Sequence, residues 1–304
     1  MTEASINIKA WIEAMRLRTL PLAVAVIAMG GFVAAFNSRF SWLIFTLAVS
    51  TTLFLQILSN LANDYGDSIH GADNADRIGP KRAVQTGAIS SKSMKKAIYV
   101  FGALSLLSGM ALIYFGLINL GWIYIAGFLG LGIMAIAAAI KYTAGDNPYG
   151  YKGLGDLFVF VFFGLIGVGG TYFLHTHQLN WLVLLPAASM GLLSVGVLNV
   201  NNMRDHISDK KAGKNSLVVK MGFKRAKTYH SLLIIGALVS AGSYMALNYN
   251  SPWQLLFLVS VPLLVLHLIA VLNNNRPQLL DKQLKILALS TMVFCITFGI
   301  GLVV

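Results

Sequence analysis

Residues 120–140 read LGWIYIAGFLGLGIMAIAAAI, a long apolar stretch that contains no charged side chain. A helix needs about 20 such residues to cross the hydrocarbon core of a bilayer. Outward from this stretch in both directions, eight more segments of the 304-residue chain have the same apolar character. The predicted spans are residues 20–36, 42–62, 96–118, 120–140, 157–174, 181–202, 229–247, 253–272 and 284–304. The sequence therefore predicts an all-α integral membrane protein with nine transmembrane helices.

The composition of the whole chain agrees with this prediction. Hydrophobic residues make up 57% of the sequence and charged residues only 11%, and the mean hydropathy is +0.71. Soluble domains carry roughly a quarter charged residues, so a soluble enzyme and a disordered chain are excluded. The net charge of +12 is spread between apolar spans, which argues against a nucleic-acid partner. The single cysteine, Cys295, rules out an intrachain disulfide and a cysteine-based metal site.

The basic residues are distributed very unevenly between the two sides of the predicted spans. Of 23 lysine and arginine residues, only Arg39 falls in a connection on one side. The other 22 lie in segments 1–19, 63–96, 141–152, 203–227 and 273–285. Because loops rich in Lys and Arg remain in the cytoplasm, we expect a multi-pass protein of the cell inner membrane. Its N-terminus and long loops are predicted to be cytoplasmic, and its C-terminus to lie outside.

The N-terminal segment 1–19 has the pattern of a helix that lies in the membrane interface. Apolar residues recur there at helical spacing, at Ile8, Trp11, Ile12 and Met15. A short amphipathic segment next to a longer apolar span is typical of interfacial helices. We therefore expect an interfacial N-terminal helix that leads into the first span.

Two acidic segments follow the second and sixth predicted spans, on the same side of the membrane. Residues 63–67 read NDYGD and residues 201–209 read NNMRDHISD. In both, an asparagine precedes an aspartate by four residues, so the two side chains project from one face of a helix. The pairs are Asn63 with Asp67 and Asn201 with Asp205. The repetition of this element at matching positions indicates a shared site at the cytoplasmic surface.

The chemistry of these side chains favours a metal–diphosphate site. Carboxylate and amide oxygens are hard ligands of the kind that Mg²⁺ prefers, and Mg²⁺ in proteins is usually shared with substrate phosphates. Lysine and arginine side chains beside the acids would neutralise the remaining phosphate oxygens. A diphosphate whose other end enters the membrane implies a lipid tail, which suggests a prenyl diphosphate as substrate.

The motifs closely resemble those of one membrane family. Together with the two acidic segments, residues 76–87 (DRIGPKRAVQTG), 149–156 (YGYKGLGD) and 213–217 (GKNSL) are similar to the UbiA superfamily of intramembrane prenyltransferases, and in particular to its MenA-type branch. That branch comprises 1,4-dihydroxy-2-naphthoate polyprenyltransferases of menaquinone synthesis. The resemblance covers the chain from Trp11 onward. It implies nine helices around a central cavity open to the cytoplasm, and transfer of a polyprenyl group to the naphthoate with decarboxylation.

The predicted site combines these residues with what the resemblance implies. Candidate Mg²⁺ ligands are Asn63, Asp67, Asp205 and Asp209. The family's first motif carries a further Asp where this chain has Gly71, so the next acid, Asp73, is an additional candidate. Candidate diphosphate-binding residues are Arg77, Arg82, Lys152 and Lys214. The resemblance implies that Tyr151, Lys152 and Asp156 line the cavity and act in catalysis together with Asp67 and Asp205.

We therefore expect one transmembrane prenyltransferase domain over residues 1–304, with cytoplasmic Asp-rich active-site loops at 63–95 and 203–227. Its expected partners are a polyprenyl diphosphate, 1,4-dihydroxy-2-naphthoate and membrane lipid, with Mg²⁺ as cofactor. Within the superfamily, the alternative is an enzyme for another aromatic acceptor, such as 4-hydroxybenzoate or homogentisate. The alternative from another class is a secondary transporter of an anionic metabolite. The absence of a charge in the middle of any predicted span argues against the transporter.

Overall fold

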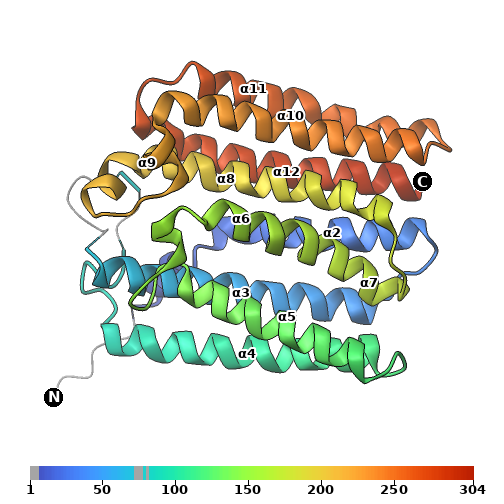
Figure 1. Ribbon diagram of the computed structural model, residues 1–304, viewed down its shortest axis with the longest axis horizontal. Coiled ribbons are helices and arrows are strands. Elements are labelled where there is room, and N and C mark those ends of the chain that lie inside the picture. Colours follow the sequence, from blue (N-terminus) through green and yellow to red (C-terminus); the bar gives the residue numbers. More distant parts are fainter. Residues whose placement is uncertain (1–6, 72–77, 80–81) are drawn as a thin grey trace.

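The computed structural model describes residues 7–71, 78–79 and 82–304, and in this part of the chain it contains helices and connections but no strand. The long helices lie side by side with their axes roughly along one direction (Figure 1). The α-helices are α1 (Ile8–Met15), α2 (Leu20–Phe36), α3 (Trp42–Ile69), α4 (Ser91–Leu117), α5 (Trp122–Lys141), α6 (Gly155–Val159), α7 (Thr171–Thr176), α8 (Leu184–Lys211), α9 (Leu217–Met221), α10 (Phe223–Leu247), α11 (Val261–Leu272) and α12 (Leu280–Val303). Shorter helical segments of other types are η1 (Leu17–Thr19), η2 (Tyr149–Lys152), η3 (Phe160–Gly170), η4 (Trp181–Val183), η5 (Pro252–Ser260) and η6 (Pro277–Leu279).

Nine helices of the described residues are long and apolar enough to cross a membrane, which confirms the predicted number of spans. The fifth span joins α6, η3 and α7 into one helical rod over Gly155–Thr176. The protein is therefore a multi-pass membrane protein.

The two spans that end in the acidic segments run further than predicted. Helix α3 continues to Ile69 instead of ending at residue 62, and α8 continues to Lys211 instead of residue 202. The apolar pattern ends where the side chains become polar, but the backbone hydrogen bonds of a helix continue into the aqueous region. The Asp-rich segments, predicted as loops, therefore begin as the last turns of two long helices. This rigid placement fixes where their carboxylates point.

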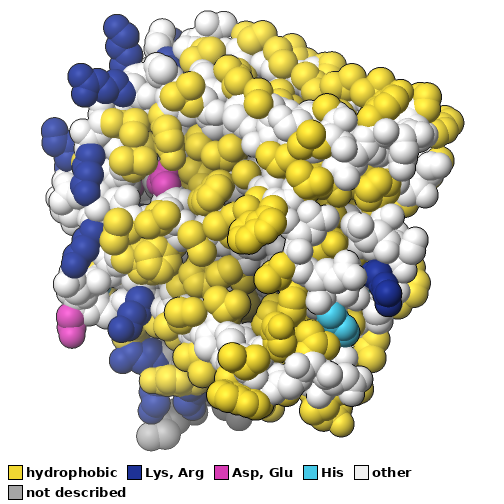
Figure 2. All heavy atoms as spheres, turned by 45° about the vertical axis from the view of Figure 1, so that its right-hand side comes forward, with side chains coloured by type: hydrophobic (Ala, Val, Ile, Leu, Met, Phe, Trp, Pro, Cys, Tyr) yellow, Lys and Arg dark blue, Asp and Glu magenta, His cyan; other side chains and the backbone are white. Residues whose placement is uncertain are grey.

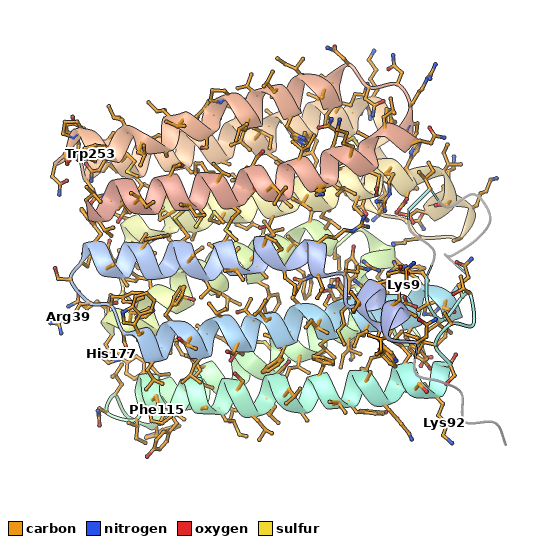
Figure 3. The ribbon with its side chains drawn as sticks, turned by 180° about the vertical axis from the view of Figure 1, so that it is seen from behind. Lys9, Arg39, Lys92, Phe115, His177 and Trp253 are labelled. Carbon is orange, nitrogen blue, oxygen red and sulfur yellow. The ribbon has the colours of Figure 1, made fainter. Side chains whose placement is uncertain are left out.

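The charged residues lie as the sequence predicts. Hydrophobic side chains cover the flank of the bundle, and lysine and arginine side chains gather at one end (Figure 2). Lys9 and Lys92 lie at this end, and Arg39 lies at the opposite end (Figure 3). We call the end with Lys9, Lys92 and the last turns of α3 and α8 the basic end.

The predicted N-terminal helix is present as α1 and is attached to α3. Asn7 caps its first turn by accepting a hydrogen bond from the backbone N–H of Ala10 at 3.1 Å. The chain then turns at Arg16, which has a φ of 50°. The amide nitrogen of Asn60, a buried residue of α3, donates to the backbone oxygen of Met15 at 2.9 Å. This contact fixes the start of the chain beside the acidic end of α3.

A buried chain of polar side chains links the last three spans. The Nε2 atoms of His230 in α10 and His267 in α11 are 2.9 Å apart. Nδ1 of His267 lies 3.0 Å from Oε1 of Gln283 in α12. Both histidines are almost fully buried, with relative exposures of 0% and 1%. No pattern in the sequence indicated this link.

Candidate active site

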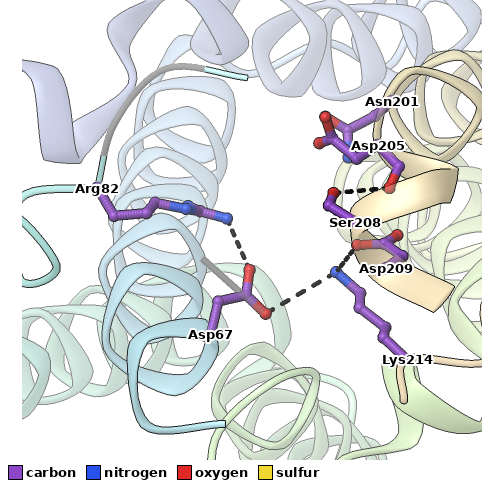
Figure 4. Close-up of a pocket in the computed structure, with 7 residues that line it drawn as sticks. All are labelled: Asp67, Arg82, Asn201, Asp205, Ser208, Asp209 and Lys214. Atoms are coloured by element: carbon purple, nitrogen blue, oxygen red, sulfur yellow. Dashed lines mark hydrogen bonds and ion pairs between the residues drawn. The ribbon is translucent and has the colours of Figure 1, made fainter. Parts of the chain in front are cut away.

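A polar pocket at the basic end lies between the last turns of α3 and α8 (Figure 4). It is lined by Asp67, Arg82, Asn201, Asp205, Ser208, Asp209 and Lys214. Five of these seven residues belong to the predicted site. The free volume between the side chains is about 10 Å³, enough for about one water molecule. The wider central cavity open to the cytoplasm remains a prediction.

Asp67 is the point where three separate segments meet. Its carboxylate is 2% exposed and accepts a hydrogen bond from Nη2 of Arg82 at 2.7 Å. The hydroxyl of Tyr151 donates to the other oxygen at 3.1 Å, and Nζ of Lys214 lies 3.8 Å from that oxygen. Burial, together with the negative charge of Asp67, raises the pKa of Tyr151. Tyr151 therefore remains protonated and acts as a hydrogen-bond donor at neutral pH.

Gly66 allows α3 to approach this group closely. A Cβ atom at residue 66 would lie 2.5 Å from the carbonyl carbon and oxygen of Thr143, closer than real side chains approach a backbone. Only glycine permits this contact between α3 and the segment that follows α5. The contact sets the position of Asp67, the next residue, relative to Tyr151.

Asp64 holds the segment that carries Arg82. Its two carboxylate oxygens accept the backbone N–H groups of Ala83 at 3.0 Å and Val84 at 3.1 Å, and the side chain is 2% exposed. Because these hydrogen bonds fix the backbone next to Arg82, Asp64 positions the guanidinium that contacts Asp67. The sequence prediction did not assign Asp64 to the site, although it lies within the first acidic motif.

On α8, Arg204 binds the acidic residue that follows it. Its Nε donates to one oxygen of Asp205 at 2.9 Å and its Nη2 to the other at 2.6 Å. The Nη2 atom also donates to Asn201 at 2.9 Å, and Nη1 donates to Asp281 of α12 at 2.6 Å. Arg204 is 1% exposed. Asp205 therefore lines the pocket with its charge already shared with a buried guanidinium.

The end of α8 directs Lys214 back into the pocket. Gly213 has a φ of 72°, and its N–H donates to the backbone oxygen of Lys210. The N–H of Lys214 donates to the backbone oxygen of Asp209 at 2.8 Å. These two bonds form a Schellman turn, in which glycine supplies the left-handed residue. The turn places Nζ of Lys214 3.7 Å from Asp209 and between Asp209 and Asp67 (Figure 4).

Tyr142 belongs to the same neighbourhood, although the sequence did not single it out. A Cβ atom added to Gly150 or Gly155 would meet its ring at 3.0 Å or less, so both glycines make room for it. Burial raises the pKa of Tyr142 to about 12. The positive charge of Lys214 lowers this pKa and the negative charge of Asp67 raises it. Several glycines lie close together in the motif at 149–156. Because glycine lets another group approach the backbone closely, this pattern could have predicted that a large side chain packs against the turn.

Four predicted site residues lie outside the pocket lining, and one of them is Tyr151, whose hydroxyl donates to Asp67. Lys152 is exposed, and its backbone oxygen accepts Nζ of Lys220 at 2.6 Å. Asp156 is 8% exposed and accepts the hydroxyl of Tyr229 of α10 at 3.0 Å. Asn63 accepts the hydroxyl of Thr143 at 3.0 Å. Two further predicted residues, Arg77 and Asp73, lie outside the described residues.

The donor atoms of the pocket suit a hard divalent cation. Asp67, Asp205 and Asp209 supply carboxylate oxygens, and Asn201 an amide oxygen, which is the ligand chemistry of Mg²⁺. In the described residues, no three acidic, histidine or cysteine side chains are close enough to hold a metal ion as they stand. The ammonium group of Lys214 lies between the carboxylates of Asp67 and Asp209. Two neighbouring negative charges favour a positive charge at this position.

The fold and this site together define a multi-pass membrane protein with an acidic and basic pocket at one end of its helices. Comparisons with known proteins identify the family. The profile of the UbiA prenyltransferase family matches residues 23–299. A 1,4-dihydroxy-2-naphthoate octaprenyltransferase of Escherichia coli (strain K12) is 44% identical over 299 residues, which cover 97% of this chain and 96% of that protein. The protein of the same name from Haemophilus influenzae is 43% identical over 300 residues, which cover 98% and 97% of the two chains.

Solved structures have the same fold. A UbiA homolog from Archaeoglobus fulgidus, bound to GPP and Mg²⁺, has a TM-score of 0.63 at 15% identity, covering 95% of this chain and 99% of that one. The apo structure of a UbiA homolog from Aeropyrum pernix K1 has a TM-score of 0.69 at 16% identity, covering 94% and 97%. The chain belongs to the UbiA prenyltransferase family, which confirms the resemblance found in the sequence. It is a membrane-embedded prenyltransferase.

Proposed function

We propose that this protein transfers a polyprenyl group from a polyprenyl diphosphate to 1,4-dihydroxy-2-naphthoate, with release of diphosphate and loss of the ring carboxylate as carbon dioxide, to give demethylmenaquinone in its reduced, quinol form. The observation that carries the proposal is the similarity along nearly the whole chain to two curated 1,4-dihydroxy-2-naphthoate octaprenyltransferases. The polar pocket at the end of the membrane helices supports it, because it has the charges that a diphosphate requires.

We assign the metal site to the acidic residues that line the pocket, Asp67, Asp205 and Asp209. Of the sequence-predicted ligands, Asn63 is the one that the structure turns toward Thr143. Asn201 takes the corresponding place in the pocket lining. When bound, Mg²⁺ supplies positive charge that neutralises the diphosphate and makes it a better leaving group. The carboxylates hold that charge at the ends of two rigid helices, which keeps it oriented before the reaction.

Arg82 and Lys214 are the proposed diphosphate-binding residues. Both point into the pocket from segments that follow the two acidic motifs (Figure 4). Arginine and lysine bind phosphate oxygens through charge-assisted hydrogen bonds. Each is held in place by Asp67, so the two cations lie on either side of the carboxylate that the metal would contact.

The acceptor is proposed to bind next to Tyr151 and Asp156. Tyr151 brings an aromatic ring next to the pocket, with Nζ of Lys214 5.6 Å from the ring centroid, and aromatic side chains pack favourably against a planar ring such as the naphthoate. Asp156 is held by Tyr229, so its carboxylate has a fixed orientation. Departure of the diphosphate leaves an allylic cation, which the electron-rich ring attacks. Six of the seven residues that line the pocket are buried, and such burial limits the access of water that would otherwise capture this cation.

The kinetic roles of two lysines test this assignment. Lys214→Ala is expected to raise the KM for the prenyl diphosphate at least about tenfold, because it removes a charge-assisted contact inside the pocket. Lys152→Ala is expected to change this KM less than about threefold, because the side chain is exposed and outside the pocket lining. Steady-state kinetics with the purified protein measure both values. A larger effect at Lys152 than at Lys214 would place the diphosphate beside residues 149–156 instead.

We also propose that the basic end faces the cytoplasm of a bacterial inner membrane, in accordance with the distribution of lysine and arginine. Single cysteines at Lys92 and Lys224 are then expected to react with a membrane-impermeant maleimide only from the cytoplasmic side. A cysteine at Asn250 is expected to react only from outside. All three positions are exposed. Labelling of residue 224 from outside would contradict the orientation.

Analysis of the product tests the function directly. Purified protein receives Mg²⁺, a mixture of prenyl diphosphates, and 1,4-dihydroxy-2-naphthoate, 4-hydroxybenzoate or homogentisate as acceptor. Mass spectrometry of the lipid extract is expected to show a prenylated 1,4-dihydroxynaphthalene, or its quinone, that has lost the carboxylate. Diphosphate is expected to be released. A product from another acceptor alone would reassign the substrate. The absence of any prenylated product and of diphosphate release would contradict prenyl transfer.

A further inference from the structure

Arg204 contacts two carboxylates from two different helices. Through Nε and Nη2 it binds both oxygens of Asp205, and through Nη1 it binds one oxygen of Asp281 at 2.6 Å. Asp281 lies in the first turn of α12, 77 residues further along the chain. It belongs to none of the motifs at the pocket. Its side chain is 42% exposed, so it reaches the buried guanidinium from the solvent side.

This arrangement has an electrostatic consequence for Asp205. A guanidinium that binds one carboxylate through two parallel hydrogen bonds forms a nearly neutral pair with it. Such a pair attracts a divalent cation weakly. Here the same guanidinium also binds Asp281, so its single positive charge is shared between two negative charges. Asp205 therefore keeps more of its negative charge for the pocket than it would beside Arg204 alone.

Asp281 also fixes the orientation of Arg204. The planar guanidinium has a fixed geometry of donors. Because Nη1 is held by Asp281 and Nη2 also donates to Asn201, the edge that carries Nε and Nη2 must face Asp205. This edge holds the carboxylate of Asp205 in the pocket lining.

We propose that Asp281 is a positioning residue for the cation site: it acts through Arg204 to orient Asp205 and to preserve its negative charge. This inference rests on the proposed use of Asp205 as a metal ligand. Arg18 lies 3.8 Å from Asp281, but both side chains of this pair are more than 40% exposed. Solvent and salt screen such a contact, so Arg18 does not cancel the effect of Asp281 on the buried pair.

The test is direct binding of Mn²⁺, as a probe for Mg²⁺, to purified protein without any substrate, followed by electron paramagnetic resonance. Asp281→Asn keeps an oxygen that can accept from Arg204 but removes the charge. We expect Mn²⁺ to bind about tenfold more weakly to this variant, as is typical when a residue supporting a metal ligand is lost. Asp281→Glu restores the charge and is expected to bind Mn²⁺ within about threefold of the original protein.

Two further variants serve as matched controls. Asp146→Asn removes an exposed carboxylate from the loop after α5. Arg18→Gln removes the exposed guanidinium that lies 3.8 Å from Asp281. Both are expected to leave Mn²⁺ affinity within about twofold. In turnover assays, Asp281→Asn is expected to raise the Mg²⁺ concentration needed for half-maximal rate and to leave the rate at saturating Mg²⁺ nearly unchanged. A residue that only stabilises the fold would not produce this separation.

Unchanged Mn²⁺ affinity in folded Asp281→Asn would overturn the proposal, as would an equal loss in Asp146→Asn. Because Asp281 is partly exposed, Asp281→Ser offers a second replacement that removes the same charge if the asparagine variant does not fold. The outcome is separable from the proposed function. If the protein gave no prenylated naphthoate but Mn²⁺ affinity still depended on Asp281, the reaction would need reassignment and the role of Asp281 would stand.

Discussion

Asp67→Asn is expected to reduce turnover at least about 100-fold at saturating Mg²⁺, the loss typical of a preorganised group that stabilises charge. The Arg82 guanidinium, the Tyr151 hydroxyl and the Lys214 ammonium converge on this carboxylate. The amide has nearly the same shape but no charge. Its NH2 group would face one of the donor groups whose hydrogen bonds the carboxylate accepts. The substitution therefore removes a proposed metal ligand and loosens both cations proposed to bind the diphosphate.

Diphosphate release by the purified variant measures this effect, and thermal unfolding in detergent measures whether the protein remains folded. The matched control is Asp146→Asn, which makes the same chemical change at an exposed loop position and is expected to retain full activity. If Asp67→Asn folded normally and kept more than about a tenth of the original turnover, the assignment of the pocket as the active site would be wrong.

Gly66→Ala is expected to have the second large effect, on both stability and activity. The added Cβ would lie 2.5 Å from backbone atoms of Thr143, which cannot move aside as a flexible side chain can. Overpacking of this kind costs typically 1–3 kcal/mol. Since α3 must shift, Asp67 moves with it, and a displacement of about 1 Å in a reacting group can lower a rate about 100-fold. We therefore expect a lower Tm and a loss of turnover in the protein that remains folded.

Gly127→Ala in α5 is the matched control, because a Cβ at residue 127 would contact nothing within 4 Å. Alanine restricts the unfolded chain more than glycine does, so this variant is expected to be equally stable or more stable by up to about 1 kcal/mol. Thermal unfolding and turnover of the two variants are compared side by side. Equal behaviour of Gly66→Ala and Gly127→Ala would show that the contact between α3 and Thr143 is not needed.

The sequence predicted the parts of this structure that depend on local pattern. Long apolar stretches predicted the nine spans, and polar residues at the ends of two of them predicted where the pocket lies. Asp67, Asp205 and Asp209 come together as expected because each lies near the end of a regular helix. Asn63 shows the limit of this reasoning. Asn201 and Asp205 both line the pocket, but the equivalent Asn63 accepts the hydroxyl of Thr143 from the segment after α5, a tertiary contact that helix spacing does not indicate.

The residues that the sequence missed depend on tertiary contacts. Asp281 meets Arg204 only because α12 packs beside α8, and a lone aspartate at the start of an apolar span carries no sign of this contact. Lys152 was placed in the site by its motif, but the turn at η2 directs its side chain to solvent. A motif identifies which segment lies at a site. Packing then decides which of its side chains enter.

The histidine chain between the last three spans has a mechanical consequence. With Oε1 of Gln283 as acceptor, His267 carries its proton on Nδ1, and its Nε2 accepts the Nε2–H of His230. Each ring then holds one proton, and the donors all point in one direction. Sliding α10, α11 or α12 along its neighbours would leave these groups unpaired where no water replaces the bond. The three spans are therefore held in one register along their lengths, whereas α3 and the end of α8 meet at the pocket through ion pairs of Lys214 with Asp67 at 3.8 Å and Asp209 at 3.7 Å.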